Sequence, residues 1–410
     1  MGAGLVTGAA DDDPSGIATY SQVGARFGYA TLWTMLLAMP LMIAIQMVSA
    51  RIGRVTGRGL ADNMLRYYPK ALVQGLVLLL LVANVINLGA DIAAMGAALQ
   101  LLIGGPALAY AMGFAVLSLA LQVFIPFSRY SAFLKVLTLS LFAYVATIFV
   151  VKIPWAEVLK QTFLPSIHPS SQFAIAIVAI LGTTISPYLF CWQAAQEVEE
   201  VKQSDEREPL KHAPAQAPDA LKRIQIDTTS GMVFSNIVAY FIILTAAAVL
   251  HAHGKTEIQS SAEAAAALKP VAGRFAFWLF AAGIIGTGLL ALPVLAGATA
   301  YATAGAWKQP YGLERKPREA RWFYGVLIGA MTLGSLLNLT PIDPIKALFW
   351  SAVINGVAAV PMMVVILLLA RNQAAMGKFV IGGWLWGLAW LATAVMAVAA
   401  VVMFVTWGKG

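Results

Sequence analysis

Three consecutive aspartates, Asp11, Asp12 and Asp13, lie in the middle of the first apolar stretch of the chain, in the segment GAADDDPSGIATYSQ. Acidic side chains inside an apolar stretch are costly, and such positions are by default candidates for functional sites. Pro14 removes a backbone hydrogen-bond donor and Gly16 relaxes the backbone, so we expect a helix to break here. An interrupted helix with freed carbonyls beside carboxylates is an oxygen-rich, negatively charged pocket, which suits a hard cation.

The segment GTTISPY indicates a second break of the same kind later in the chain. Gly182 and Pro187 bracket a short polar stretch that contains Thr183 and Ser186. Broken helices at matching places in the two halves of a membrane protein point to a binding site between them. The two breaks together therefore predict where a ligand would bind.

A simpler interpretation of the aspartates stays open. The first span could begin after Pro14, with the three aspartates as helix caps in water. The second break argues against this alternative. Elsewhere, Asp91 is the other acidic residue deep inside an apolar stretch, whereas Asp227 and Asp343 lie at the starts of such stretches.

The elements that must position these residues are membrane spans. The chain has 410 residues, of which 60% are hydrophobic and 11% are charged, whereas a soluble domain has about 25% charged residues. Several apolar runs exceed the roughly 18 residues that a transmembrane helix needs. We predict an all-α integral membrane protein with about 11 transmembrane helices, at 3–24, 30–50, 72–103, 106–127, 131–151, 172–195, 228–251, 273–304, 322–339, 344–370 and 380–407.

The distribution of Lys and Arg predicts a multi-pass plasma-membrane protein with a cytoplasmic N-terminus. In that orientation 19 of the 27 lie in cytoplasmic loops, in the sense of the positive-inside rule. Beyond the lipid bilayer we expect no nucleic acid and no protein partner. The single cysteine, Cys191, excludes a disulfide framework or a thiolate metal cluster. Without a nucleotide-binding loop, nucleophile–base pair or cofactor motif, we expect neither an enzyme nor a bound cofactor.

The spacing of the two breaks predicts an internal repeat. They fall in spans one and six, as in an inverted repeat of five helices, about 1–151 against about 172–370, with a further helix at about 380–407. The chain is then a single transmembrane domain, 1–410. Its one long hydrophilic segment, 197–226, reads as a solvated and partly disordered cytoplasmic linker.

Several segments resemble the NRAMP family of divalent-metal transporters. DDPSGIATYSQVGARFGYATLW is similar to the family's first span, whose motif is Asp-Pro-Gly-Asn, and GTTISPY is similar to its sixth span, where Met-Pro-His follows an unwound segment. Further segments match in order: SARIGRVTGRGLAD, GADIAAMGAAL, QIDTTSGMVFSNIVAYFIILTAA, GIIGTGLLALPVLAGATAYATAGAW and SAVINGVAAVPM. The resemblance implies a LeuT-like fold and secondary transport of a divalent metal by alternating access.

The resemblance also implies a metal site with altered ligands. Asp13 falls on the family's metal-binding aspartate, and Thr183 falls on the residue that offers a backbone carbonyl to the metal. Gly16 stands where the family has an asparagine ligand, and Ser186 stands where it has a methionine ligand. Asp12 would lie beside these residues. Losing a soft sulfur removes the group that favours transition metals, and losing two side-chain ligands leaves room for a partly hydrated ion. The site therefore looks like that of the magnesium-transporting, NRAMP-related branch, with Mg²⁺ and/or Mn²⁺ favoured as the transported ion.

Other departures concern proton coupling. Tyr188 stands where the family has histidine, Ala94 where span three usually carries a glutamate linked to proton movement, and Ala352 where span ten has a glutamine. Asp91 retains the other acidic residue of span three, so Asp91 and Tyr188 are candidates for the transport pathway or coupling. A phenol titrates at about pH 10 and alanine not at all, so proton coupling is predicted to be weak or absent.

Two other functions stay open. An ion-coupled symporter of a small organic solute on the same fold would aim a half-helix N-terminus, near Gly16 or Gly182, at a substrate carboxylate. The aspartate cluster would repel such an anion. A non-transporting sensor or channel-like member of the family would need the 197–226 segment for signalling, and nothing specific is found there.

Overall fold

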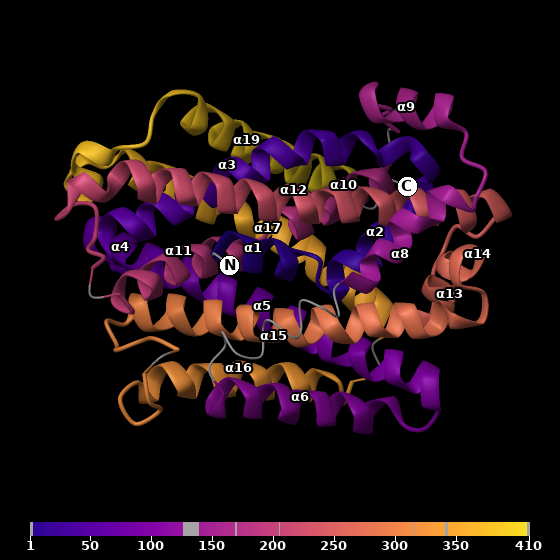
Figure 1. Ribbon diagram of the computed structural model, residues 1–410, viewed down its shortest axis with the longest axis horizontal. Coiled ribbons are helices and arrows are strands. Elements are labelled where there is room, and N and C mark those ends of the chain that lie inside the picture. Colours follow the sequence, from indigo (N-terminus) through magenta and orange to yellow (C-terminus); the bar gives the residue numbers. More distant parts are fainter. Residues whose placement is uncertain are drawn as a thin grey trace.

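The computed structural model describes residues 3–125, 139–168, 170–204, 206–313, 315–340 and 343–407, and this described part is helical, without strands. Figure 1 shows a bundle of long helices with α1 and α2 in its interior. The longer helices are α1 (Ala3–Asp11), α2 (Pro14–Phe27), α3 (Trp33–Thr56), α5 (Lys70–Ile103), α6 (Ala107–Phe124), α10 (Ser171–Thr184), α11 (Pro187–Lys202), α12 (Ala217–Val249), α15 (Ala276–Ala306), α16 (Arg321–Leu337), α17 (Pro344–Arg371) and α19 (Gly383–Thr406). The shorter ones are α4 (Leu60–Tyr67), α8 (Phe142–Ala146), α9 (Trp155–Phe163), α13 (Ser261–Ala265), α14 (Lys269–Ala272) and α18 (Gln373–Met376).

The predicted all-α membrane architecture is confirmed. Within the described residues, eight helical segments are long and apolar enough to cross a membrane, and two shorter apolar ones, Leu139–Phe149 and Arg321–Leu337, fall on predicted spans. The first predicted span is the broken pair α1 and α2. Of the predicted span 131–151, residues 131–138 lie outside the described residues.

Two long helices are interrupted where the sequence predicts. The first stops at Asp11 and resumes at Pro14, and the second stops at Thr184 and resumes at Pro187. Proline at the first position of a helix loses nothing, because the amide there has no partner inside the helix. The same residue cannot continue a preceding helix, so each proline both ends one half-helix and begins the next.

Glycines let the broken helices approach their neighbours closely. A Cβ on Gly8 of α1 would lie 2.2 Å from the carbonyl oxygen of Gly231 on α12. On α10, a Cβ on Gly182 would lie 2.5 Å from the amide nitrogen of Gly356 on α17. Small residues at such crossings are the usual way in which membrane helices pack.

The segment between α11 and α12 is largely exposed, as predicted, but it is ordered, which the prediction did not include. We expected 197–226 to be a solvated, partly disordered linker, but α11 and α12 extend into it and leave only 203–216 between them. The amide of Leu210, which is buried, donates to the carbonyl of Arg54 at the end of α3 over 3.2 Å. The Arg54 guanidinium donates to Oε1 of Gln216 over 2.8 Å. A buried arginine needs fixed acceptors, and the segment folds to supply them.

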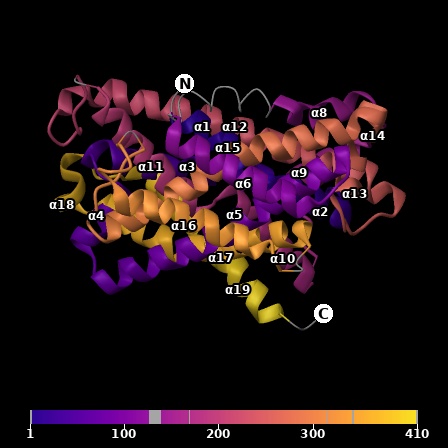
Figure 2. The ribbon, with the colours of Figure 1, turned by 90° about the horizontal axis from the view of Figure 1, so that it is seen from below.

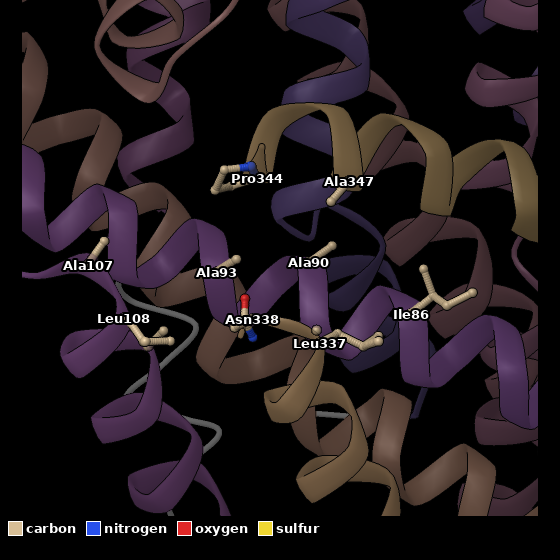
Figure 3. A pocket seen from close by; sticks show the side chains of 11 residues that line it. Ile86, Ala90, Ala93, Ala107, Leu108, Leu337, Asn338, Pro344 and Ala347 are labelled. Atoms are coloured by element: carbon tan, nitrogen blue, oxygen red, sulfur yellow. The ribbon is translucent and has the colours of Figure 1, made fainter. Parts of the chain in front are cut away.

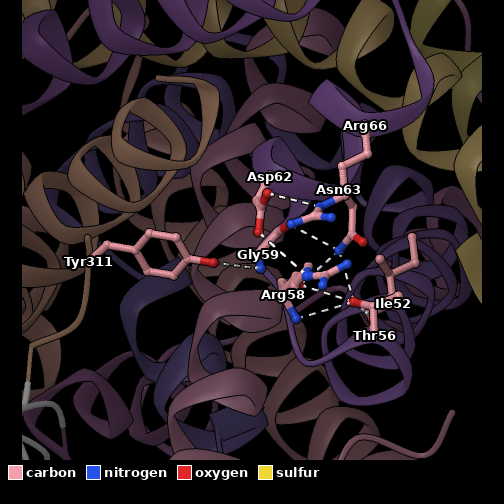
Figure 4. Close-up of polar contacts among 8 residues, drawn as sticks. All are labelled: Ile52, Thr56, Arg58, Gly59, Asp62, Asn63, Arg66 and Tyr311. Atoms are coloured by element: carbon pink, nitrogen blue, oxygen red, sulfur yellow. Dashed lines mark hydrogen bonds and ion pairs between the residues drawn. The ribbon is translucent and has the colours of Figure 1, made fainter. Parts of the chain in front are cut away.

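The corner between α3 and α4, at the same end of the bundle, is fixed by a polar cluster (Figure 4). Asp62 forms ion pairs with Arg58 (3.9 Å) and Arg66 (3.3 Å), and the amide of Gly59 donates to the hydroxyl of Tyr311 over 3.3 Å. Burial, and then the charge of Asp62, raise the pKa of Tyr311 to about 12, so its hydroxyl stays protonated at neutral pH. These contacts join α4 to the segment after α15. The opposite end carries α13 and α14 (Figure 2).

Candidate metal site

The carboxylate of Asp13 is the centre of the first break, and the residue is 1% exposed. It caps α2: its Oδ1 accepts from the Gly16 amide over 2.8 Å and from the Ser15 hydroxyl over 2.7 Å. Its Oδ2 accepts from Nδ2 of Asn87 on α5 over 3.0 Å, and the Tyr188 hydroxyl on α11 lies 3.4 Å away. Donors from α2, α5 and α11 therefore lie within hydrogen-bonding distance of Asp13, and the single hydrogen of the Tyr188 hydroxyl can go to Asp13 or to the carbonyl of Ala10.

Both interpretations of the aspartates are partly right. Asp13 is an N-cap before a proline, as the simpler alternative required. It is not in water, however, because α1 precedes it and all three aspartates are at most 1% exposed. A cap at the surface and a cap at the centre of a membrane protein have the same local geometry and very different electrostatics.

A backbone carbonyl becomes available at the first break. In a continuous helix the Ala10 carbonyl would accept from the amide of residue 14, and Pro14 has none. The Tyr188 hydroxyl lies 3.3 Å from this carbonyl oxygen. Ala10 was missed in the sequence analysis, although counting four residues back from the proline would have identified it.

The second break repeats this pattern without a charge. Pro187 leaves the Thr183 carbonyl without its helical donor in the same way. Ser186 occupies the N-cap position of α11, but its side chain caps nothing there. Its hydroxyl instead lies 2.6 Å from the Gly182 carbonyl and 2.9 Å from the Thr183 carbonyl. The predicted site residues Thr183 and Ser186 are therefore in direct contact.

The two breaks meet at Gly16. A Cβ on Gly16 would lie 3.2 Å from Oγ1 of Thr183 and 3.3 Å from the Asp11 carbonyl. The structure thus brings together Asp13, Gly16, Tyr188 and Thr183 from three half-helices, α2, α10 and α11. A larger side chain at position 16 requires its neighbours to move by a few tenths of an ångström.

Asp11 and Asp12 face away from this group, toward α12. The hydroxyl of Ser235 on α12 lies 2.5 Å from Oδ2 of Asp11 and 3.2 Å from Oδ1 of Asp12. The second oxygen of each carboxylate is buried and has no hydrogen-bond partner among the residues that the structure describes. Asp12 was predicted to lie at the metal site. It is next to Asp13 in sequence, but its carboxylate accepts a hydrogen bond from α12 instead.

Asp91 lies on α5 one turn beyond Asn87, on the same face of the helix. It is fully buried, and among the described residues no side chain forms a hydrogen bond with its carboxylate, which the backbone amide of Ser15 approaches. Ala94 and Ala352 are also buried and supply no polar side chain. Asp91 is thus the remaining acidic group on this face of α5.

The four buried carboxylates have no basic partner. Among the described residues, the ion pairs involve other acidic side chains and none of Asp11, Asp12, Asp13 and Asp91. No group of three His, Cys, Asp or Glu side chains converges into a metal cage in that part of the chain. Buried carboxylates need compensation by a cation or by protons. Any cation here would also use carbonyl, amide or water oxygens, which hard ions accept.

Two cavities flank the site. One, of about 290 Å³, lies between α2, α10 and α17 and is lined by Arg26, Gln172 and Glu257; Arg26 donates to Gln172 over 2.5 Å. The other, of about 260 Å³, lies between α5, α6, the end of α16 and the start of α17, and is lined mainly by apolar side chains such as Ala90 and Leu337, together with Asn338 (Figure 3). The lining of the first cavity includes charged side chains, whereas the polar side chain in the lining of the second is Asn338.

Asn87 and Ser351 were also missed in the sequence analysis. Both side chains are fully buried, and the Ser351 hydroxyl on α17 lies 2.6 Å from Oδ1 of Asn87. A polar residue in the apolar stretch 72–103 was a usable signal for Asn87. Its contact with Asp13 is tertiary, so the sequence alone did not reveal it.

Comparison with known proteins gives consistent results. Two bacterial proteins named "Divalent metal cation transporter MntH" are similar to this chain. The protein of Verminephrobacter eiseniae is 27% identical, and the match covers 85% of this chain and 80% of the relative. The protein of Acidiphilium cryptum is 28% identical, and the match covers 93% of this chain and 84% of the relative. The structure of an Eremococcus coleocola manganese transporter superposes with a TM-score of 0.74 at 18% identity, covering 99% of this chain and 85% of that one.

Mhp1, a nucleobase-cation-symport-1 family transporter with a LeuT-like fold, superposes with a TM-score of 0.60 at 12% identity, covering 99% of this chain and 92% of that one. At these identities the structural likenesses show the fold. The sequence profile described as "Natural resistance-associated macrophage protein-like" matches residues 4–406. With nearly its whole length matched, this chain belongs to the Nramp family.

Proposed function

We propose that this protein is a secondary transporter that carries a divalent cation across the plasma membrane by alternating access, with Asp13 as the central ligand. The observation that carries the proposal is the set of four buried carboxylates without a basic partner, beside two helix breaks. Charges at this depth are retained where they serve an ion pathway. Members of the Nramp family are transporters rather than enzymes, and the relatives named above carry divalent-metal names.

The ion would lie between the two breaks. Asp13 supplies the charge, and the carbonyls of Ala10 and Thr183 are the backbone oxygens that the prolines leave without helical donors. Gly16 contributes no side chain, so part of the hydration shell can stay on the ion. Asp12, bonded to α12, would attract the ion toward the break without binding it directly.

Alternating access would use the breaks as hinges. At the end that carries α4, α1 packs on α12, where the Gly4 amide donates to Asp227 over 2.5 Å. At the other end, α2 and α10 border the polar cavity that contains Arg26. The site is closed from both ends, because Asp13 is 1% exposed. With a cytoplasmic N-terminus, moving α1 would open the inner path, and moving α2 and α10 the outer one.

The ion favoured would be Mg²⁺ and/or Mn²⁺. At the position where the family has a methionine, Ser186 offers a hydroxyl, which contacts two backbone carbonyls, and the sulfur of Met95 lies beside Gly288 on α15. Oxygen ligands and retained water suit Mg²⁺, and Mn²⁺ also accepts them. Neither Tyr188 nor Ala94 can relay a proton at neutral pH, so we propose weak or absent proton coupling.

The test is uptake of Mn²⁺ and Mg²⁺ into proteoliposomes by Asp13→Asn, with Asp343→Asn as the matched control. Both aspartates cap a helix that begins with proline, but Asp343 lies at the end of α17 and accepts from the Lys346 amide over 3.0 Å. Asp13→Asn should reduce uptake at least about 100-fold, the loss typical of removing a buried charge partner. Asp343→Asn should leave uptake unchanged. Wild-type uptake by Asp13→Asn would refute the proposal.

A further inference from the structure

A chain of hydrogen bonds connects α17 through α5 to the Asp13 carboxylate. The Ser351 hydroxyl lies 2.6 Å from Oδ1 of Asn87, and Nδ2 of Asn87 donates to Oδ2 of Asp13 over 3.0 Å. Ser351 and Asn87 are both fully buried, and neither belongs to a broken helix. Neither side chain has a role in the function proposed above.

The hydroxyl of Ser351 has two acceptors and one hydrogen. Its Oγ lies 2.6 Å from Oδ1 of Asn87 and also 2.7 Å from the carbonyl oxygen of Leu348, one turn back in α17. A serine hydroxyl donates once and accepts through its lone pairs. It can therefore donate to Asn87 or to Leu348, but not fully to both.

Each choice fixes the orientation of the Asn87 amide. When Ser351 donates to Asn87, the amide oxygen faces Ser351 and the NH₂ group faces Asp13, which satisfies the carboxylate without an ion. When Ser351 donates to Leu348, its oxygen can accept from the NH₂ group, and the amide oxygen then faces Asp13. Two facing oxygens repel each other unless a cation lies between them.

We propose that Asn87 is a reversible ligand of the transported cation: its amide turns over when the ion binds, so that Oδ1 replaces Nδ2 beside Asp13, and Ser351 switches its donation to Leu348. The inference rests on the function proposed above. It adds a specific oxygen ligand from α5 to the bound state. In the ion-free state, the NH₂ group of Asn87 donates a hydrogen bond to the Asp13 carboxylate. The substrate class is a hard divalent cation, because a carboxamide oxygen is a ligand for such ions.

Asn84 provides a matched control on the same helix. It is buried like Asn87, but its Nδ2 donates to Oγ1 of Thr299 on α15 over 2.8 Å rather than to Asp13. Asn84→Leu and Asn87→Leu therefore remove the same amide from the same helix, and only the second change affects the carboxylate. Asn87→Asp keeps an oxygen at both positions of the amide and cannot donate.

The experiment is calorimetric titration of the purified full-length protein with MnCl₂ and MgCl₂, with thermal unfolding of every variant. Asn87→Leu should weaken binding of both ions at least about tenfold, the effect of losing one hydrogen-bonding group to a charge. Ser351→Ala should weaken it about threefold, because one neutral hydrogen bond is lost. Asn87→Asp should bind at least as tightly as wild type, and Asn84→Leu should bind like wild type.

Two results would overturn the inference. Binding by Asn87→Leu within about twofold of wild type would show that the amide is no ligand. Loss in Asn87→Asp as large as in Asn87→Leu would show that only donation to Asp13 matters. Asp13→Asn separates these failures from failure of the proposed function: if Asp13→Asn does not bind while Asn87→Leu binds normally, only the role of Asn87 is wrong.

Discussion

The two helix breaks share one backbone plan and differ in charge. In each, a proline begins the second half-helix, and the carbonyl four residues before it loses its helical donor. At the first break the cap is Asp13, which accepts hydrogen bonds from several helices. At the second it is Ser186, whose hydroxyl points back to carbonyls of α10. The proline determines where the helix opens, and the cap residue determines what the opening can bind.

The strongest way to test this comparison is to make the first break neutral like the second. Asp13→Ser keeps an N-cap of nearly equal quality, so α2 should remain folded. Uptake should fall at least about 100-fold, because the buried charge that replaces the hydration shell is gone. Ser186→Ala, which removes the cap hydroxyl of the second break, should change uptake by no more than about threefold. Uptake into proteoliposomes and thermal unfolding should be measured for both variants. Equal losses of uptake in Asp13→Ser and Ser186→Ala would contradict the proposal that only the first break supplies charge to the ion.

A smaller effect is expected from giving the breaks softer and more numerous ligands. Gly16→Asn together with Ser186→Met should raise Mn²⁺ or Cd²⁺ affinity about tenfold and reduce Mg²⁺ transport, because a thioether favours softer ions. The Gly16 change requires Thr183 to shift slightly. Competition calorimetry decides the point. If wild type already binds Mn²⁺ tightly and millimolar Mg²⁺ fails to compete, the preference for a hard ion is wrong.

The smallest effect is expected for protons. The phenol of Tyr188 and the methyl group of Ala94 cannot exchange protons near neutral pH. Metal uptake should therefore cause no measurable acidification of the vesicle interior beyond that of empty vesicles, followed with a trapped pH dye. Asp91 could carry a proton, since its carboxylate is fully buried and forms no ion pair with any described residue. Metal-dependent acidification that disappears in Asp91→Asn would show that it does.

Local chemistry made the breaks predictable. Pro14 and Pro187 each remove one amide hydrogen, and this effect depends on sequence alone. The long apolar stretches likewise predicted the spans, since a membrane helix must satisfy its own backbone. The boundaries of the two repeats stay a prediction.

Tertiary contacts were not predictable in the same way. Asn87 contacts Asp13 because α5 packs beside the start of α2. Asp12 contacts Ser235 on α12 and therefore points away from Asp13. The prediction that the 197–226 segment is partly disordered was wrong, although many of its charged side chains, such as Glu206 and Lys211, are exposed as expected. The acceptors that Arg54 needs order part of it instead. The composition of a segment indicates how favourable its exposure to water is, but it does not identify the tertiary contacts that its side chains make.

The most direct test of the account is to locate the ion by anomalous diffraction from crystals of the protein grown with Mn²⁺. The account predicts one strong peak between the two breaks, within bonding distance of the Asp13 carboxylate and of a freed carbonyl of Ala10 or Thr183. Added Mg²⁺ should weaken this peak, and Asp13→Asn should abolish it. A peak between Asp11, Asp12 and Ser235, or a peak at the breaks that persists in Asp13→Asn, would contradict the account.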